Sequence, residues 1–245
     1  MNIDAQKFNS TLTKVFKANS LSSLLNMDKC EKFYKLTVRM LEENEKYNLT
    51  AITEVDKIIL NHYADCASIA HLLPKGASII DVGCGAGFPT LPLAILRDDL
   101  KITAIDSTAK RITYVSDTAE MLGLKNITAI TMRAEDGGND PKMRESFDFA
   151  TARAVANMRV LAELCLPFVK VGGTFIAMKG KNAQFELNEA KKAISLLGGR
   201  DTKCEDMTLK GESEDASHPL IIVKKKEKTP GGYPRPFAQI SKKPL

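Results

Sequence analysis

The spacing of apolar residues along the chain predicts alternating strands and helices. Short apolar runs of strand length occur at residues 77–82, 101–106, 127–131, 147–152 and 174–178. Helical spacing occurs at residues 54–73, 110–122, 157–169 and 183–197. Two further apolar stretches, 207–209 and 220–223, predict a closing antiparallel hairpin. This alternation predicts an α/β fold with a doubly wound, mostly parallel sheet and right-handed crossovers.

The composition changes along the chain predict three parts. Residues 1–60 form an N-terminal helical extension packed on the core, because residues 4–45 combine mixed charge with helical spacing of apolar side chains. Residues 61–228 form the main α/β domain. Residues 229–245 form a basic tail, whose proline and glycine content argues against a helix or a central strand.

A glycine-rich turn follows the first predicted strand, in the segment "IIDVGCGAGFP" (residues 79–89). Gly83, Gly85 and Gly87 permit a tight turn and let a ligand approach bare backbone. A dinucleotide fingerprint would place its third glycine at Phe88, and a P-loop would need a lysine after the last glycine. The loop therefore matches neither of these phosphate-binding patterns.

A second acid follows the next strand. Asp106 lies nineteen residues beyond Gly87, where α/β nucleoside sites place a carboxylate for the ribose hydroxyls. Together with Asp81 and the glycine loop, it resembles the Rossmann-like class I methyltransferases. Their cofactor, S-adenosyl-L-methionine, contains an adenosine but no pyrophosphate. A surface aspartate at a strand end is the alternative for Asp106.

Cysteine, histidine and hydropathy patterns bound the environment. The five cysteines form no CxxC pair, and the three histidines are scattered, so we predict no disulfide framework and no metal site. No signal peptide and no long apolar run is apparent, so a reduced, cytoplasmic protein without a membrane segment is expected.

Positive charge is concentrated at the carboxyl end. Residues 224–245 carry +6 while the whole chain carries +5, so the other 223 residues carry −1. Tyr233 and Phe237 lie among these basic residues, an arrangement that suits RNA, whose phosphates attract cations and whose bases stack on rings. A solvated terminus that only improves solubility is the alternative.

The fourth predicted strand ends in "TARA" (residues 151–154), which lacks several known methylation motifs. It has no Asp/Asn-Pro-Pro-aromatic motif for an exocyclic amine, and Arg153 stands where ribose methylation would want an aspartate. For pyrimidine C5 chemistry, Cys165 is expected in a helix core and Cys84 in the glycine loop, so neither suits a nucleophile. Guanine N7 carries its own lone pair, and proximity and orientation can drive its methylation without a general acid or base.

Several longer motifs resemble one family. They are "KYNLTAIT" (46–53), "HYADC" (62–66), "IDVGCGAGFPTLPLAI" (80–95), "IDSTAKRITYV" (105–115), "RAED" (133–136), "TARAVANM" (151–158) and "MKGK" (178–181). The set resembles the RsmG family, also called glucose-inhibited division protein B. The resemblance implies a Rossmann-like domain with a helical extension. It also implies methylation of N7 of a guanosine in a loop of bacterial 16S ribosomal RNA.

The resemblance also implies roles for single residues. Gly83 and Phe88 would contact the cofactor, together with Gly85 and Asp106, and Ala134 and Glu135 would border the adenine. Arg153 would lie by the methionine end or the incoming RNA. Phe88 also suits a hydrophobic plug at the helix start, and Glu135 and Arg153 have ordinary surface roles as alternatives.

Basic residues are predicted to hold RNA. We expect Lys179, Lys181 and Arg235 to contact phosphates, and Arg153 and Lys179 to position the substrate, although solvated lysines are the alternative. His62 and Asp65 lie one helical turn apart and form either a structural pair or a substrate contact. Cys66 replaces the family's more usual serine, which puts a hydroxyl hydrogen bond there in doubt.

The expected partner is 16S ribosomal RNA or the small ribosomal subunit, bound by a monomer. Two other classes of protein fit the same fold: a small-molecule methyltransferase, and a non-catalytic RNA-binding or ribosome assembly factor. The basic carboxyl end argues against the first, and cofactor affinity would argue against the second.

Overall fold

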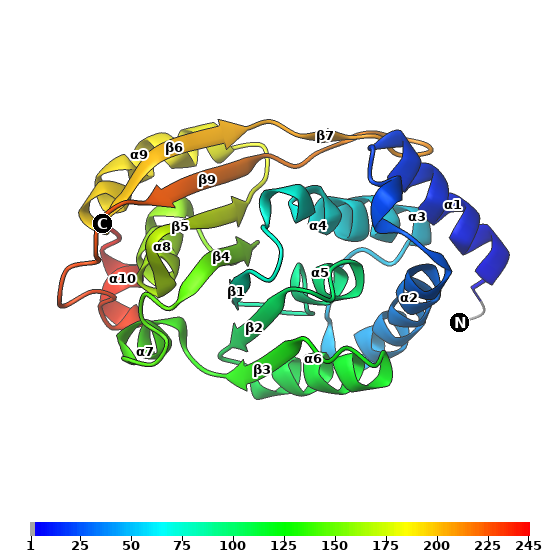
Figure 1. Cartoon of the computed structure of the whole chain (residues 1–245), viewed down its shortest axis with the longest axis horizontal. Coiled ribbons are helices and arrows are strands. Elements are labelled where there is room, and N and C mark those ends of the chain that lie inside the picture. Colours follow the sequence, from blue (N-terminus) through cyan, green and yellow to red (C-terminus); the bar gives the residue numbers. More distant parts are fainter. Residues whose placement is uncertain (1–2) are drawn as a thin grey trace.

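Alternate side chains of the strands pack into two separate apolar cores. Ile79 lies in one cluster with the N-terminal helices, whereas its neighbour Ile80 lies in the other. Because successive strand residues point to opposite faces and both faces are apolar here, helices must cover both. The computed structural model, which describes residues 3–245, has this arrangement (Figure 1).

The main sheet has seven strands: β1 (Ser78–Val82), β2 (Lys101–Asp106), β3 (Ile127–Thr131), β4 (Phe147–Arg153), β5 (Val169–Met178), β6 (Gly199–Glu205) and β9 (Leu220–Lys225). A separate pair of short strands consists of β7 (Thr208–Leu209) and β8 (Ala216–Ser217). The α-helices of the described chain are α1 (Ala5–Ala18), α2 (Met27–Tyr47), α3 (Val55–Ile58), α4 (Asp65–Ser68), α5 (Thr90–Leu96), α6 (Ala109–Met121), α7 (Ala134–Asn139), α8 (Met158–Cys165), α9 (Ala183–Leu196) and α10 (Phe237–Lys242). A π-helical segment, Ile59–Ala64, joins α3 to α4, and short 3-10 turns lie at Ser22–Leu24, Ala70–Leu72 and Leu166–Phe168.

The strand order confirms the predicted doubly wound sheet. It runs β3-β2-β1-β4-β5-β9-β6, with β1 to β5 parallel and β9 antiparallel to both of its neighbours. The chain winds outward in one direction through β2 and β3 and in the other through β4 and β5. In such sheets, ligands bind at the carboxyl ends of the strands where the order reverses. That point lies here between β1 and β4.

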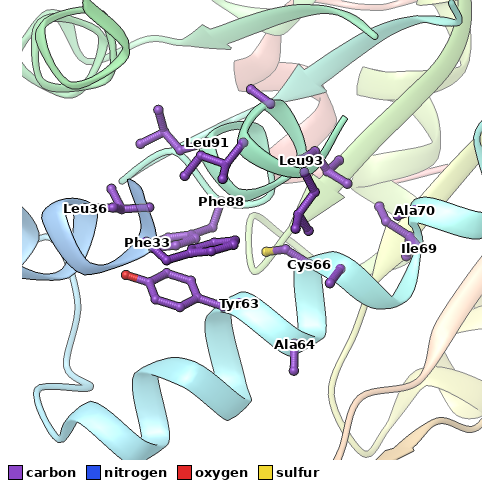
Figure 2. Close-up of a cluster of buried hydrophobic side chains, with 14 of the residues drawn as sticks. Phe33, Leu36, Tyr63, Ala64, Cys66, Ile69, Ala70, Phe88, Leu91 and Leu93 are labelled. Carbon is purple, nitrogen blue, oxygen red and sulfur yellow. The ribbon is translucent and has the colours of Figure 1, made fainter. Parts of the chain in front are cut away.

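The N-terminal helices share one apolar core with the glycine loop. The predicted amphipathic helices are α1 and α2, and the Asp4 side chain caps α1 by accepting hydrogen bonds from two backbone amides. Figure 2 shows Phe33 of α2 beside Tyr63 and Phe88, and the Phe33 and Tyr63 ring centroids are 4.6 Å apart. The predicted boundary after residue 60 falls inside the continuous helical segment from α3 to α4.

A closing antiparallel arrangement is confirmed, but residues 207–209 and 220–223 do not pair with each other as predicted. β9 pairs with β6, an edge strand that the apolar pattern did not indicate, and β7 pairs with β8. Most side chains of β6 are exposed or half-buried, and its sequence is GRDTKCE. An edge strand with few buried side chains carries little hydrophobic signal, so the pattern could not indicate it.

The predicted helix at 157–169 also ends too late. α8 stops at Cys165, a 3-10 turn that contains Pro167 follows, and β5 begins at Val169. The strand continues through Gly172 and Gly173, beside a register shift in its pairing with β4. Glycine is common at such irregular positions, so the glycine pair marked a strand irregularity here and no helix end.

The basic tail contains a helix that its composition argued against. α10 begins after Pro236, and its Ile240 is fully buried. Proline is compatible with a helix start, because the first amides of a helix have no intrahelical partner. Across residues 3–245, no helix is both long enough and apolar enough to cross a membrane.

Candidate active site

The glycine loop joins β1 to α5 in a backbone conformation that favours glycine. Gly83, Gly85 and Gly87 have φ angles of 73°, 55° and 85°, all in the left-handed region. A Cβ atom at Gly83 would lie 2.8 Å from Val155, and one at Gly87 would lie 2.5 Å from Leu91. The backbone therefore requires glycine at all three positions, and close packing adds to the requirement at two of them.

The acid at the end of β2 is tied to this loop. Asp106 is buried, and its Oδ2 atom accepts a hydrogen bond from the Gly85 amide at 3.0 Å. Its Oδ1 atom accepts one from the Thr108 amide at 2.8 Å, and Arg111 Nη1 lies 3.4 Å from Oδ2. The carboxylate thus holds the loop in place while it lines the cavity beside the loop.

The acid at the end of β1 is a brace within the fold. Asp81 is buried and accepts hydrogen bonds from the hydroxyls of Thr90 and Thr151, at 2.6 and 3.1 Å. Burial raises the pKa of Asp81 to about 6, and the two hydroxyl hydrogen bonds oppose that rise. Asp81 therefore joins β1 to α5 and β4, the elements on either side of the loop.

A cavity of about 540 Å³ lies at the carboxyl ends of the strands, a volume within the usual range for small-molecule sites. It is lined by every residue predicted to bind the cofactor: Gly83, Gly85, Phe88, Asp106, Ala134, Glu135 and Arg153. The wall also contains residues that the sequence pattern did not single out, among them Leu49, Thr50, Arg111, Met132, Val155 and Leu164. The fold therefore brings the loops after β1, β2, β3 and β4 together around one cavity.

Arg153, the last residue of β4, crosses to the helical segment beside the cavity. Its Nη1 atom lies 3.1 Å from Asp65 Oδ2 and donates to the Asn61 carbonyl at 2.9 Å. The guanidinium carbon lies 5.0 Å from the centroid of the Phe88 ring. The arginine is thus held by a buried acid, a backbone carbonyl and an aromatic face.

His62 packs on the same Phe88 ring as Arg153. Its ring centroid lies 4.5 Å from that of Phe88, and its Nδ1 atom lies 3.2 Å from Arg153 Nη2. Burial, together with the Arg153 charge, lowers the pKa of His62 to about 3. His62 is therefore neutral at physiological pH, and its Nε2 atom lies 3.0 Å from the Thr50 hydroxyl.

Asp65 connects this cluster to the segment between β8 and β9. Its Oδ1 atom lies 3.4 Å from Nδ1 of His218, which follows β8, and His218 Nε2 lies 3.0 Å from Asn61 Oδ1. Burial raises the pKa of Asp65, and the charge of Arg153 opposes the shift. His62 and Asp65 both contact Arg153, and His62 also lines the cavity, so the structural pair and the substrate contact both remain predictions. No sequence signal indicated His218.

Cys66 lies in the apolar cluster beneath the site. It is fully buried, and Figure 2 shows its sulfur directed toward the Phe33 and Phe88 rings. Burial raises the pKa of the Cys66 thiol, so it stays protonated and acts as a small apolar side chain. The thiol thus fills space under the glycine loop.

Comparison with known proteins identifies the family. The family description rRNA small subunit methyltransferase G (GidB) matches residues 29–214. The protein named Ribosomal RNA small subunit methyltransferase G from Clostridium perfringens (strain 13 / Type A) is 47% identical over 229 residues, which are 93% of this chain and 95% of that protein. The chain belongs to this family. A second relative of the same name, from Lactobacillus delbrueckii subsp. bulgaricus, is 43% identical over 247 residues, 99% of this chain and 100% of that protein.

Solved structures outside the methyltransferase G family share the fold. A SAM-dependent O-methyltransferase from Thermotoga maritima superimposes with a TM-score of 0.54 at 16% identity, covering 78% of this chain and 72% of that one. The M. jannaschii protein TYW2 in complex with AdoMet gives a TM-score of 0.51 at 16% identity, covering 65% and 73%. The predicted class I methyltransferase fold and the resemblance to the RsmG family are confirmed.

The lysines predicted to hold RNA lie outside the cavity wall of this family member. Lys179 is largely buried: its Nζ atom lies 2.7 Å from Glu186 and donates to the Ala156 carbonyl at 2.8 Å. Lys181, two residues further on, is exposed. Lys179 therefore supports the β4–α8 loop, whereas Lys181 presents its charge to solvent.

Arg235 is engaged within the protein. Its Nη2 and Nε atoms lie 2.6 and 2.8 Å from the two carboxylate oxygens of Glu163, whose side chain is fully buried. The hydrogen bonds of Arg235 to this carboxylate anchor the tail on α8. Among residues 3–245, no group of three or more His, Cys, Asp or Glu side chains is placed to hold a metal ion.

Proposed function

We propose that this protein transfers a methyl group from S-adenosylmethionine to N7 of a guanosine in a loop of 16S ribosomal RNA. The observation that carries the proposal is the single cavity that joins the glycine loop, Asp106 and Arg153 in a member of the methyltransferase G family. Its relatives are named as methyltransferases of small-subunit ribosomal RNA.

The cavity residues fit this cofactor. The left-handed glycines leave bare backbone at the loop, and the Asp106 carboxylate lies at the end of β2, where ribose hydroxyls can donate to it. Ala134 and Glu135, at the start of α7, border the adenine in this proposal. When bound, the cofactor supplies an electrophilic methyl group on a sulfonium sulfur.

The protein's task in the transfer is orientation. Guanine N7 has a free lone pair, so no residue needs to remove a proton. Arg153 lies at the cavity with its guanidinium fixed by Asp65 and its face over Phe88. It positions the methionine end of the cofactor or the guanosine, and alignment of the reacting atoms supplies the rate. Lys179 acts through the loop that it supports.

The target guanosine must leave its helix or lie in a loop. In A-form RNA, N7 lies in a deep and narrow groove that side chains cannot enter. A base swung out of its stack can reach the cavity above Gly83 and Arg153, where the β4–α8 loop carries the exposed Val155. Phosphates around it would be held by exposed cations, of which Lys181 is one.

Nucleoside mass spectrometry tests the proposal. Small-subunit ribosomal RNA from cells with and without the gene is digested, and 7-methylguanosine is quantified. We expect one residue per subunit to lose its methyl group, and the purified protein with S-adenosylmethionine to restore it. Equal 7-methylguanosine in both samples, or restoration without the cofactor, would contradict the proposal.

Two further experiments define the setting of the reaction. Naked 16S RNA and purified small subunits, offered in parallel, identify which one is the substrate in the cytoplasm. Light scattering of the active fraction tests the proposed monomer. Cofactor binding without any methyl transfer would favour a non-catalytic assembly factor on the same fold.

A further inference from the structure

The carboxyl-terminal segment is fastened to the protein by its own backbone carbonyls. Arg144 donates through Nη1 to the Tyr233 carbonyl at 2.6 Å and through Nη2 to the Thr229 carbonyl at 2.8 Å. Asn139, the last residue of α7, donates to the Pro234 carbonyl at 3.0 Å. These contacts fix the path of the segment beside α7 before α10 begins.

A second set of contacts fixes α10 against α8. The Arg235 amide and guanidinium both donate to the buried Glu163 of α8, and Ile240 of α10 is fully buried. Arg159 of α8 donates to the Pro244 carbonyl at 2.5 Å and also to the Leu245 carbonyl. Contacts just before and just after α10 therefore fix its position, and Figure 1 shows it beside α7 and α8.

This anchoring delivers one aromatic ring to the cavity. Phe237, the first residue of α10, lines the cavity together with Leu164 and the Met132–Glu135 stretch that follows β3. Phe237 is 42% exposed, and its ring packs on no other aromatic ring among the described residues. An exposed phenylalanine alone is ordinary. A phenylalanine that a buried ion pair holds at the wall of a ligand cavity is a specific arrangement.

The position along the cavity indicates which part of a ligand the ring meets. α10 lies beside α7, whose first residues Ala134 and Glu135 border the adenine in the proposed function, and Asp106 marks the ribose. Arg153 and the α4 segment, which mark the methyl-transfer end, lie on the β4 side of the cavity. The ring therefore belongs to the nucleoside end.

We propose that Phe237 is a further cofactor-binding residue, whose ring packs on the adenine of S-adenosylmethionine and closes the nucleoside end of the cavity. The inference rests on the proposed function. Flat aromatic rings pack well on the faces of bases, and Leu164 and Met132 supply the remaining apolar wall. The carboxyl-terminal segment thus completes the cofactor site from a distant part of the chain.

Calorimetric titration of single variants tests the inference. We expect Phe237→Ala to weaken S-adenosylmethionine by about tenfold, within the range of stacking contributions, and Phe237→Tyr to keep wild-type affinity. Methylthioadenosine, which has the adenine and ribose but lacks the amino-acid part, should lose the same factor. Phe185→Ala is the matched control, because Phe185 is an exposed phenylalanine on α9, 69% exposed and away from the cavity wall.

Other results overturn the inference. Unchanged cofactor affinity in Phe237→Ala, with a raised Michaelis constant for the small subunit, would place the ring on RNA. A loss for S-adenosylmethionine without a loss for methylthioadenosine would move the ring away from the adenine. If Phe237→Ala does not fold, Phe237→Leu keeps the apolar bulk and removes the flat ring, and it is expected to weaken both ligands. Wild-type protein that binds no S-adenosylmethionine would instead refute the proposed function.

Discussion

Arg153 and Asp65 form an ion pair that joins the end of β4 to the helical segment beside the cavity, with Nη1 and Oδ2 separated by 3.1 Å. The two residues are 88 positions apart in the chain, and both side chains are largely buried. A buried carboxylate is costly without a partner, so each residue fixes the other. The ion pair therefore holds the guanidinium over Phe88 at the cavity wall.

Asp65→Asn keeps the volume of the side chain but removes its charge, so Arg153 should be held less firmly. We expect kcat to fall about 10- to 100-fold through misorientation, with cofactor affinity changing less. The free energy of unfolding should fall by about 1–3 kcal/mol, the scale of a lost hydrogen bond to a charged group. Single-turnover kinetics and urea denaturation measure the two effects. Asp28→Asn, which removes an exposed partner of Lys32, is the control. It should leave kcat unchanged and alter the free energy of unfolding by no more than about 0.5 kcal/mol.

Gly85→Val should abolish cofactor binding, since Gly85 has a φ of 55° in the loop that faces the ligand. Gly85→Ala is the milder variant, because its Cβ would meet only the Gly83 carbonyl oxygen at 3.9 Å. Gly123→Ala is a matched control: Gly123 has a φ of 66°, nothing lies within 4 Å of its Cβ position, and it ends α6 away from the cavity wall.

Both alanine variants should lose about 1–2 kcal/mol of stability through the left-handed backbone alone. Only the Gly85 variants should lose cofactor affinity in calorimetric titration. A folded Gly85→Val protein with wild-type affinity would show that the loop does not contact the cofactor.

Asp106→Ala should weaken S-adenosylmethionine by about 1–3 kcal/mol, because charged acceptors make strong hydrogen bonds to ribose hydroxyls. It also removes the acceptor of the Gly85 amide, so part of the loss comes through the loop. Asp106→Asn keeps an oxygen acceptor and should lose less. Titration with 2′-deoxy and unmodified methylthioadenosine separates the two causes, since only a ribose contact distinguishes these ligands.

The neutral state of His62 predicts a loss of stability in acid. The pKa of His62 lies near 3 in the folded protein and near 6.5 in the unfolded chain. Between these values the unfolded chain binds a proton that the folded protein does not. The contribution of neutral His62 to the free energy of unfolding is complete above pH 6.5. It is lost as the pH falls toward 3, by at most about 1.4 kcal/mol per pH unit.

Urea denaturation at a series of pH values measures this slope. His62→Gln should reduce the acid loss relative to wild type, whereas His71→Gln, at an exposed position, controls for removal of an imidazole. Identical slopes in His62→Gln and wild type would show that His62 is not the group responsible.

The packing of the tail changes how its contact with RNA must be tested. Deletion of residues 229–245 removes Arg235 from the buried Glu163 and should cost about 3–5 kcal/mol of stability, which obscures any effect on RNA. Lys242 and Lys243 are exposed on the same segment. Lys242→Gln with Lys243→Gln should raise the Michaelis constant for RNA and reduce its salt slope by about 2, with stability and cofactor affinity unchanged. If the variant kept the wild-type salt dependence, these two lysines would not contact RNA and would only improve solubility.

The parallel sheet and most elements of the cofactor cavity were predictable from the amino-acid sequence. Buried strands and glycine turns are local features. An apolar run such as residues 79–82 indicates a buried strand, and the three closely spaced glycines, which have left-handed φ angles here, indicate a tight turn. The role of Asp106 was also predictable, because an acid at the end of a parallel strand lies at the edge of the sheet where ligands bind. The family resemblance added Ala134, Glu135 and Arg153, and the fold places them on the same cavity.

The pairing of charged residues depends on the three-dimensional packing and could not be predicted from the sequence. Arg235 and Lys179 are basic in sequence, yet they contact Glu163 and Glu186, because long side chains pair with whatever acid the packing brings near. His218 is 153 residues from Asp65 and joins it only because β9, which begins just after His218, pairs with β5 next to β4. The strand β6 and the helix α10 are stabilised by neighbours distant in sequence, and such long-range contacts leave no local periodic pattern.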